Sequence, residues 1–123
     1  MVEGKGQAVE HFGLSPRALG LLREVFYRHP EVHAVKIFGS RAMGHFEDCS
    51  DVDLALWGDI DLRLIGRVVR ELDELPLPYT FDVKAYEAIK HTPLKHHIDE
   101  FGKILYGTDD DIFATPENGD RPQ

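Results

Sequence analysis

Apolar residues recur every three or four positions in three stretches of the chain, which is the spacing of helices with one buried face. The first helix is predicted to begin at Pro16, because Ser15 is a good N-cap and proline suits the first helical position. It should end by about residue 29, since Pro30 follows. The other two predicted helices cover residues 62–75 and 94–106.

Shorter stretches in which apolar residues alternate with polar ones, or run together, predict β-strands. These predicted strands cover residues 34–38, 51–57 and 79–85. In the last of them Asp82 and Lys84 face away from the apolar positions. Strands interspersed with helices in this order predict a small α+β domain, with a mixed sheet of three or four strands and helices packed on one face.

The order of the elements predicts where the polar residues of the strands meet. The helix between the second and third strands is long enough for a crossover, so these two strands can be parallel neighbours. Asp51, Asp53 and Asp82 then lie at the same edge of the sheet. If the first strand is antiparallel to the second, its end at Phe38 and Gly39 reaches that edge too.

This edge has the residue types of a site for a nucleoside triphosphate and divalent metal ions. A glycine-serine turn, Gly39-Ser40, exposes backbone N–H groups before one turn of helix, an arrangement that favours phosphate. Asp51 and Asp53 project on one side of their strand with Cα atoms about 7 Å apart, close enough for one ion or a pair. Mg²⁺ is the expected ion, because it prefers hard oxygen ligands and substrate phosphates.

Length and charge limit the organisation of the chain. Its 123 residues are enough for one domain, expected at residues 15–107. A loose lead-in is expected over residues 1–14 and an acidic, disordered tail over residues 108–123. The formal net charge of −8 argues against broad binding of a nucleic-acid backbone.

Targeting and redox signals are sparse. The chain has no apolar run long enough to span a membrane and no signal-peptide pattern at its start, so no membrane contact and a cytoplasmic location are expected. Cys49 is the only cysteine, which excludes an internal disulfide and a cysteine-built zinc site.

The ordered set of turn and carboxylates resembles the signature of the polymerase-beta-like nucleotidyltransferase superfamily. The set is Gly39-Ser40, then Asp51-Val52-Asp53, then Asp82 on a later strand. The phrases FGSRAMG, SDVDLAL and GKILYG, and the short length, resemble its minimal nucleotidyltransferase (MNT) branch. The resemblance spans about residues 32–107 and implies the nucleotidyltransferase fold.

The resemblance implies transfer of AMP from ATP to an acceptor hydroxyl, with release of pyrophosphate. Gly39, Ser40 and Arg41 would bind the nucleotide, and Asp51 and Asp53 would ligate two Mg²⁺ ions. Asp82 would complete the metal site and help deprotonate the acceptor. Many minimal members pair with a HEPN-domain ribonuclease toxin, so the resemblance implies an antitoxin that AMPylates a tyrosine of such a partner.

Several alternatives stay open at this level. The leading hypothesis is the enzyme. A second possibility is a non-catalytic antitoxin that neutralises its HEPN partner by contact, and a third is transfer to a small molecule or an RNA end. Arg41 has two open roles, a phosphate contact or a surface ion pair with Glu47 or Asp48. Met43 stands where the family often has a basic residue, which removes one phosphate contact. The nucleotide, the acceptor and any homo- or hetero-oligomer are not determined by the sequence.

Overall fold

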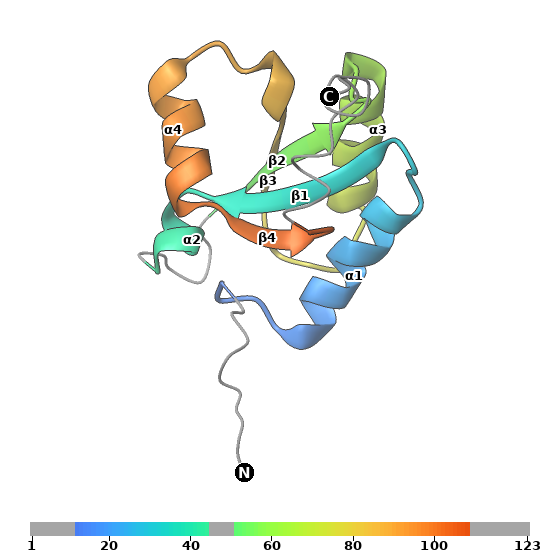
Figure 1. Ribbon diagram of the computed structural model, residues 1–123. Coiled ribbons are helices and arrows are strands. Elements are labelled where there is room, and N and C mark those ends of the chain that lie inside the picture. Colours follow the sequence, from blue (N-terminus) through green and yellow to red (C-terminus); the bar gives the residue numbers. More distant parts are fainter. Residues whose placement is uncertain (1–11, 45–50, 109–123) are drawn as a thin grey trace.

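A four-stranded sheet lies between helices in the computed structural model, which describes residues 12–44 and 51–108 (Figure 1). The strands are β1 (Val32–Phe38), β2 (Val52–Gly58), β3 (Phe81–Ala85) and β4 (Lys103–Tyr106). The helices are α1 (Pro16–Tyr27), α2 (Ser40–Met43), α3 (Leu62–Asp73), the short 3₁₀-helix η1 (Tyr86–Ala88) and α4 (Thr92–Phe101). This architecture confirms the predicted α+β fold class, with four strands in a mixed sheet.

The starts of α1 and α3 follow from local capping. Ser15 Oγ accepts a hydrogen bond from the Ala18 N–H at 3.0 Å, and Pro16 is the first helical residue. Asp61 Oδ1 accepts from the Leu64 N–H at 2.8 Å in the same way. Both helices therefore begin where the sequence predicts them.

The strand order in the sheet is β3-β2-β1-β4. β1 is antiparallel to both β2 and β4, whereas β2 and β3 are parallel. In this register Asp53 of β2 is paired with Phe38 on one side and with Asp82 on the other. The predicted meeting of the β1 end with both aspartate-bearing strands at one edge is confirmed.

Helices cover both faces of the sheet, although the sequence predicts them on one. α1 and α3 pack on one face over the main core, which contains Leu22, Leu54 and Val68 among its fully buried residues. α4 packs on the opposite face, where Ile98 joins a second core (Figure 1). The second core consists of Ala34, Phe38, Ala55, Trp57 and Ile98. The face that carries Asp53 is therefore partly covered, because small and aromatic residues further along β1 and β2 make it apolar enough to hold a helix.

The predicted last helix, residues 94–106, is wrong in its second half. α4 ends at Phe101, because Gly102 adopts an extended conformation with φ −64° and ψ 149°. The following residues form β4, which pairs with β1 at the edge of the sheet. The Arg23 Nε donates a hydrogen bond to the Leu105 carbonyl at 2.9 Å, which connects β4 to α1.

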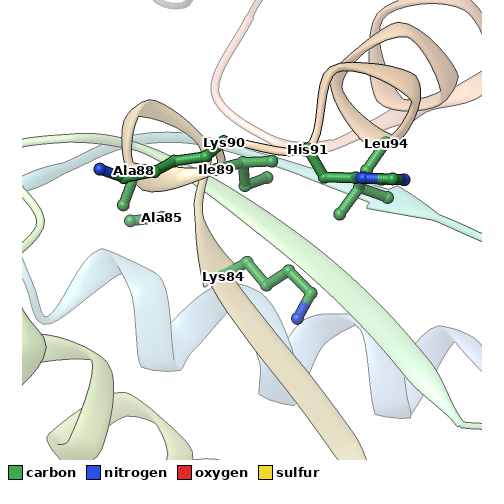
Figure 2. A pocket seen from close by; sticks show the side chains of 7 residues that line it. All are labelled: Lys84, Ala85, Ala88, Ile89, Lys90, His91 and Leu94. Carbon is green, nitrogen blue, oxygen red and sulfur yellow. The ribbon is translucent and has the colours of Figure 1, made fainter.

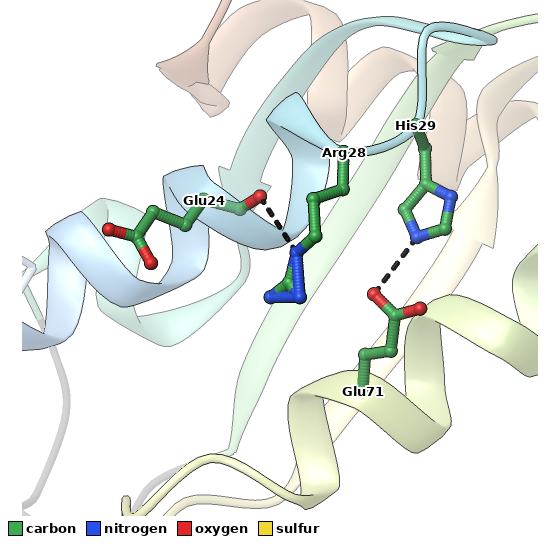
Figure 3. Close-up of polar contacts among 4 residues, drawn as sticks. All are labelled: Glu24, Arg28, His29 and Glu71. Carbon is green, nitrogen blue, oxygen red and sulfur yellow. Dashed lines mark hydrogen bonds and ion pairs between the residues drawn. The ribbon is translucent and has the colours of Figure 1, made fainter.

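A buried polar pair joins the end of α1 to α3. His29 follows α1 and is only 6% exposed, and its Nε2 lies 2.9 Å from Glu71 Oε1 (Figure 3). On the surface of the same helix, the Arg28 Nε donates to the Glu24 carbonyl at 3.5 Å. The His29–Glu71 pair satisfies an imidazole that the core would otherwise leave without a partner.

The ends of the chain lie largely outside the described residues, as do residues 45–50. Within the described part, Phe12 and Leu14 fall in the predicted lead-in but are buried, 9% and 2% exposed. The packed region therefore begins before Ser15. None of the helices that the structure describes is long and apolar enough to cross a membrane.

Candidate active site

The turn between β1 and α2 depends on a glycine. Gly39 has φ 78° and ψ −154°, a conformation in which residues with a side chain are strained. A Cβ built on Gly39 would overlap Asp53 Oδ2 and lie 3.3 Å from Asp53 Cγ. Glycine thus allows the backbone of the turn to lie directly against the carboxylate of Asp53.

Three carboxylates are grouped near this turn, and Asp53 lies directly against it. Asp53 is half-buried on β2, Asp82 is exposed and is its register partner on β3, and Asp51 is exposed just before β2 begins. Asp53 and Asp82 therefore lie in the strands predicted for them, whereas Asp51, predicted to begin its strand, lies one residue before it. A cation is already part of the group, because Lys84 Nζ lies 3.6 Å from Asp82 Oδ1.

Asp53 is the electrostatically strained member of the group. Burial raises the pKa of its carboxyl above the ordinary value of 3.8, and the negative charges of Asp82 and Asp51 raise it further. The positive charge of Lys84, and that of His97 when its ring is protonated, lowers the same pKa but does not offset these effects. The site thus concentrates negative charge where the ionised form of Asp53 is already unfavourable, which is the setting that a bound cation relieves.

The donor set suits Mg²⁺ in its chemistry. Three carboxylates supply the hard oxygen ligands that Mg²⁺ prefers. Within residues 12–44 and 51–108, however, no three metal-ligating side chains lie close enough to form a finished metal cluster.

His97 of α4 belongs to the site, although the sequence did not point to it. The Gly39 N–H donates a hydrogen bond to His97 Nε2 at 3.1 Å. The imidazole ring lies edge-on to the Phe38 ring, with centroids 6.2 Å apart, and 5.4 Å from that of Phe101. Its proximity to Phe101, four positions further along α4, is visible as helical spacing, but its partner Gly39 is not.

Arg41 is buried behind the turn. Its side chain is among the largest fully buried ones, and the residue is 1% exposed. The Arg41 NH1 donates to the Phe12 carbonyl at 2.7 Å, and the guanidinium lies 4.9 Å from the centre of the Tyr79 ring. A surface position for Arg41 is therefore wrong, and residues 47 and 48 lie outside the described residues. Its assignment to nucleotide binding stays a prediction.

A pocket of about 300 Å³ lies between the end of β3, η1 and the start of α4. Its lining residues are Lys84, Ala85, Ala88, Ile89, Lys90, His91 and Leu94 (Figure 2). Lys84 belongs both to this pocket and to the ion pair with Asp82, so the pocket opens next to the candidate active site. Its volume is at the lower end of the range for small-molecule sites.

Residues 21–111 match the protein family described as Polymerase beta, Nucleotidyltransferase. No curated protein matches the chain. Among solved structures, a toxin-antitoxin crystallised with AMP-PNP is 23% identical with a TM-score of 0.64, covering 76% of this chain and 77% of that one. A mutant of the toxin-antitoxin MntA-HpeT is 26% identical with a TM-score of 0.58, covering 77% and 74%.

One further similar structure includes a modified partner. It is a complex of tri-AMPylated Shewanella oneidensis HEPN toxin with MNT antitoxin. The similar chain is 21% identical with a TM-score of 0.59, and the likeness covers 80% of this chain and 78% of that one. At this level of identity the likeness shows a shared fold.

Proposed function

Because the chain belongs to the polymerase beta nucleotidyltransferase family, we propose that it is a Mg²⁺-dependent enzyme that transfers AMP from ATP to a protein hydroxyl. The observation that supports this most is the row formed by the Gly39 turn, Asp53 and Asp82. These residues come from three different elements, and Gly39 has no Cβ where it meets the carboxylate. Packing of the core alone would not require two carboxylates, Asp53 and Asp82, to be paired in register beside a glycine turn.

Each residue of the row has a proposed role. Gly39 allows close approach of the backbone to the terminal phosphates, and the Ser40 hydroxyl donates to them. Asp51, Asp53 and Asp82 would hold the metal ions, and Mg²⁺ bound there would neutralise charge on the triphosphate. Since the Gly39 N–H already donates to His97, the part assigned to Gly39 is its shape rather than its N–H.

The chemistry is a displacement at the α-phosphorus of ATP. The acceptor oxygen forms a bond to this phosphorus while the bond to the bridging oxygen of pyrophosphate breaks and its electron pair leaves with pyrophosphate. The hydroxyl proton passes to the carboxylate of Asp82. Positioning and electrostatic stabilisation supply most of the rate in phosphoryl transfer, and covalent participation of the protein is not needed.

The proposed acceptor is a tyrosine of a HEPN-domain toxin, for which the chain acts as the antitoxin. Support comes from the similar structures, among which are a toxin-antitoxin with AMP-PNP and an MNT antitoxin in complex with AMPylated HEPN toxin. The described elements form one small domain with the candidate site at the edge of its sheet, where a group presented by another molecule can reach it.

The test is incubation of the chain with Mg-ATP and the HEPN protein encoded beside it, followed by intact-mass measurement of both proteins. The expected result is the mass of one or more AMP groups added to the HEPN protein, and none with Asp53→Ala. If Asp53→Ala is folded and neutralises the toxin as well as the wild type does, the chain acts by contact and the proposed chemistry is wrong.

A further inference from the structure

We propose that His97 is a positioning residue for nucleotide transfer. From α4, it holds the Gly39 turn against Asp53. This inference rests on the proposed function. It assigns a role to a side chain outside the row of turn and carboxylates, on a helix that does not carry any of them.

The Gly39 turn is held by a tertiary contact. A backbone at φ 78° and ψ −154° is the mirror image of an extended conformation, one of several that glycine can adopt, so the dihedral preference alone does not fix the turn. Its N–H donates to His97 Nε2, which lies 58 positions further along the chain. The turn is therefore fixed by a tertiary contact as well as by α2, where the Met43 N–H donates to the Gly39 carbonyl at 3.2 Å.

The imidazole of His97 is itself held in place. Its ring contacts Phe38 and Phe101, and the next residue, Ile98, is fully buried in the second core. Because Nε2 accepts the hydrogen bond, the neutral ring carries its proton on Nδ1. The accepting atom thus has a defined tautomer and a defined position.

The contact reaches the carboxylate through the glycine. Gly39 lies so close to Asp53 that an added Cβ would overlap Oδ2, so any shift of the turn changes the space left for this carboxylate. Loss of the Nε2 acceptor would leave the Gly39 N–H without this partner and the turn free to move.

Three variants separate positioning from packing. His97→Phe keeps an aromatic ring between Phe38 and Phe101 but removes the acceptor. His97→Gln keeps an acceptor atom at about the position of Nε2. His96→Phe changes the neighbouring, exposed histidine of the same helix and is the matched control.

The measurements are the thermal midpoint, the ATP dissociation constant by calorimetry with and without Mg²⁺, kcat and KM for AMP transfer, and the backbone amide signal of Gly39 by NMR. For His97→Phe we expect a folded protein, a shifted Gly39 amide signal and roughly tenfold weaker ATP binding or slower transfer. His97→Gln should recover most of this loss, and His96→Phe should match the wild type.

The inference is overturned if folded His97→Phe binds ATP and transfers AMP as the wild type does, or if His97→Gln recovers nothing. Should His97→Phe not fold, His97→Asn replaces it, because its shorter side chain does not reach the Gly39 N–H. Equal ATP binding by the Asn and Gln variants then overturns the inference. A wild type that binds ATP without transferring AMP contradicts the proposed function alone, whereas a wild type that binds no ATP contradicts both.

Discussion

Gly39→Ala should lower the free energy of unfolding more than an alanine substitution at any other described glycine near the site. Gly39 combines a positive φ of 78° with ψ −154°, a region that is nearly restricted to glycine and costs other residues about 1–3 kcal/mol. The new Cβ would also overlap Asp53 Oδ2. The carboxylate has to rotate away, and an off-rotamer side chain costs about 0.5–1.5 kcal/mol.

Together these two costs predict a loss of about 2–4 kcal/mol in the free energy of unfolding. For a domain of this size each kcal/mol lowers the thermal midpoint by about 4 °C or more. Two other glycines are matched controls. Gly44 has a positive φ of 80° but open space around it, so Gly44→Ala should cost only about 1–2 kcal/mol. Gly20 lies in the middle of α1 with open space, so Gly20→Ala should stabilise by about 0.5–1 kcal/mol.

Urea and thermal denaturation of the three variants without Mg²⁺ check this order. The reasoning about the turn is refuted if Gly39→Ala loses no more stability than Gly44→Ala. In that case Asp53 would have room to move at no cost, and the contact with Gly39 would not define the position of the carboxylate.

Three further changes test other parts of the molecule by urea denaturation. The pKa of Asp53 is raised in the native state, so the carboxyl contributes fully to stability below pH 3.8 and this contribution is lost as the pH rises through the native pKa. The free energy of unfolding of Asp53→Asn should therefore increase relative to that of the wild type between pH 3.8 and the native pKa, and the difference should persist at higher pH. A pH-independent difference would contradict this. Arg41→Met should lower the free energy of unfolding by roughly 2–3 kcal/mol or more, since the buried guanidinium donates to the Phe12 carbonyl. Normal stability together with lost ATP binding would instead indicate a phosphate contact. Glu71→Ala should cost about 1–3 kcal/mol by leaving buried His29 without its acceptor, and Glu71→Gln should cost less; equal losses would rule out the hydrogen bond as the cause.

Elements with local signals were predicted well. α1 and α3 begin directly after their N-cap residues Ser15 and Asp61, because each capping side chain accepts a hydrogen bond from an N–H three residues further on. The strand pairing that brings Asp53 beside Asp82 also followed from local evidence, because the length of the intervening helix allowed a parallel pair. The row of candidate residues could therefore be placed at one edge of the sheet from the sequence.

Features that depend on distant partners could not be predicted. Phe101 and Leu105 are four positions apart, a spacing that would place them on one face of a helix. Leu105 lies in β4 instead, because this segment pairs with the edge of β1. The burial of Arg41 depends on a carbonyl 29 positions away, and the role of His97 on an amide 58 positions away. Neither spacing nor composition carries information about such contacts.

The position of Asp53 is unfavourable for stability, because its carboxylate is half-buried among other negative charges. Asp53 begins the stretch of its strand that continues into the second core with Ala55 and Trp57, so packing draws its carboxylate out of water. The same packing brings α4, and with it His97, to the turn. Burying a carboxylate among like charges destabilises the fold in the absence of a cation, and a ligand that binds only the native state returns that stability. A cation bound at this edge would offset part of the cost of burying Asp53, so the proposed function predicts that Mg-ATP stabilises the fold more than ATP alone does.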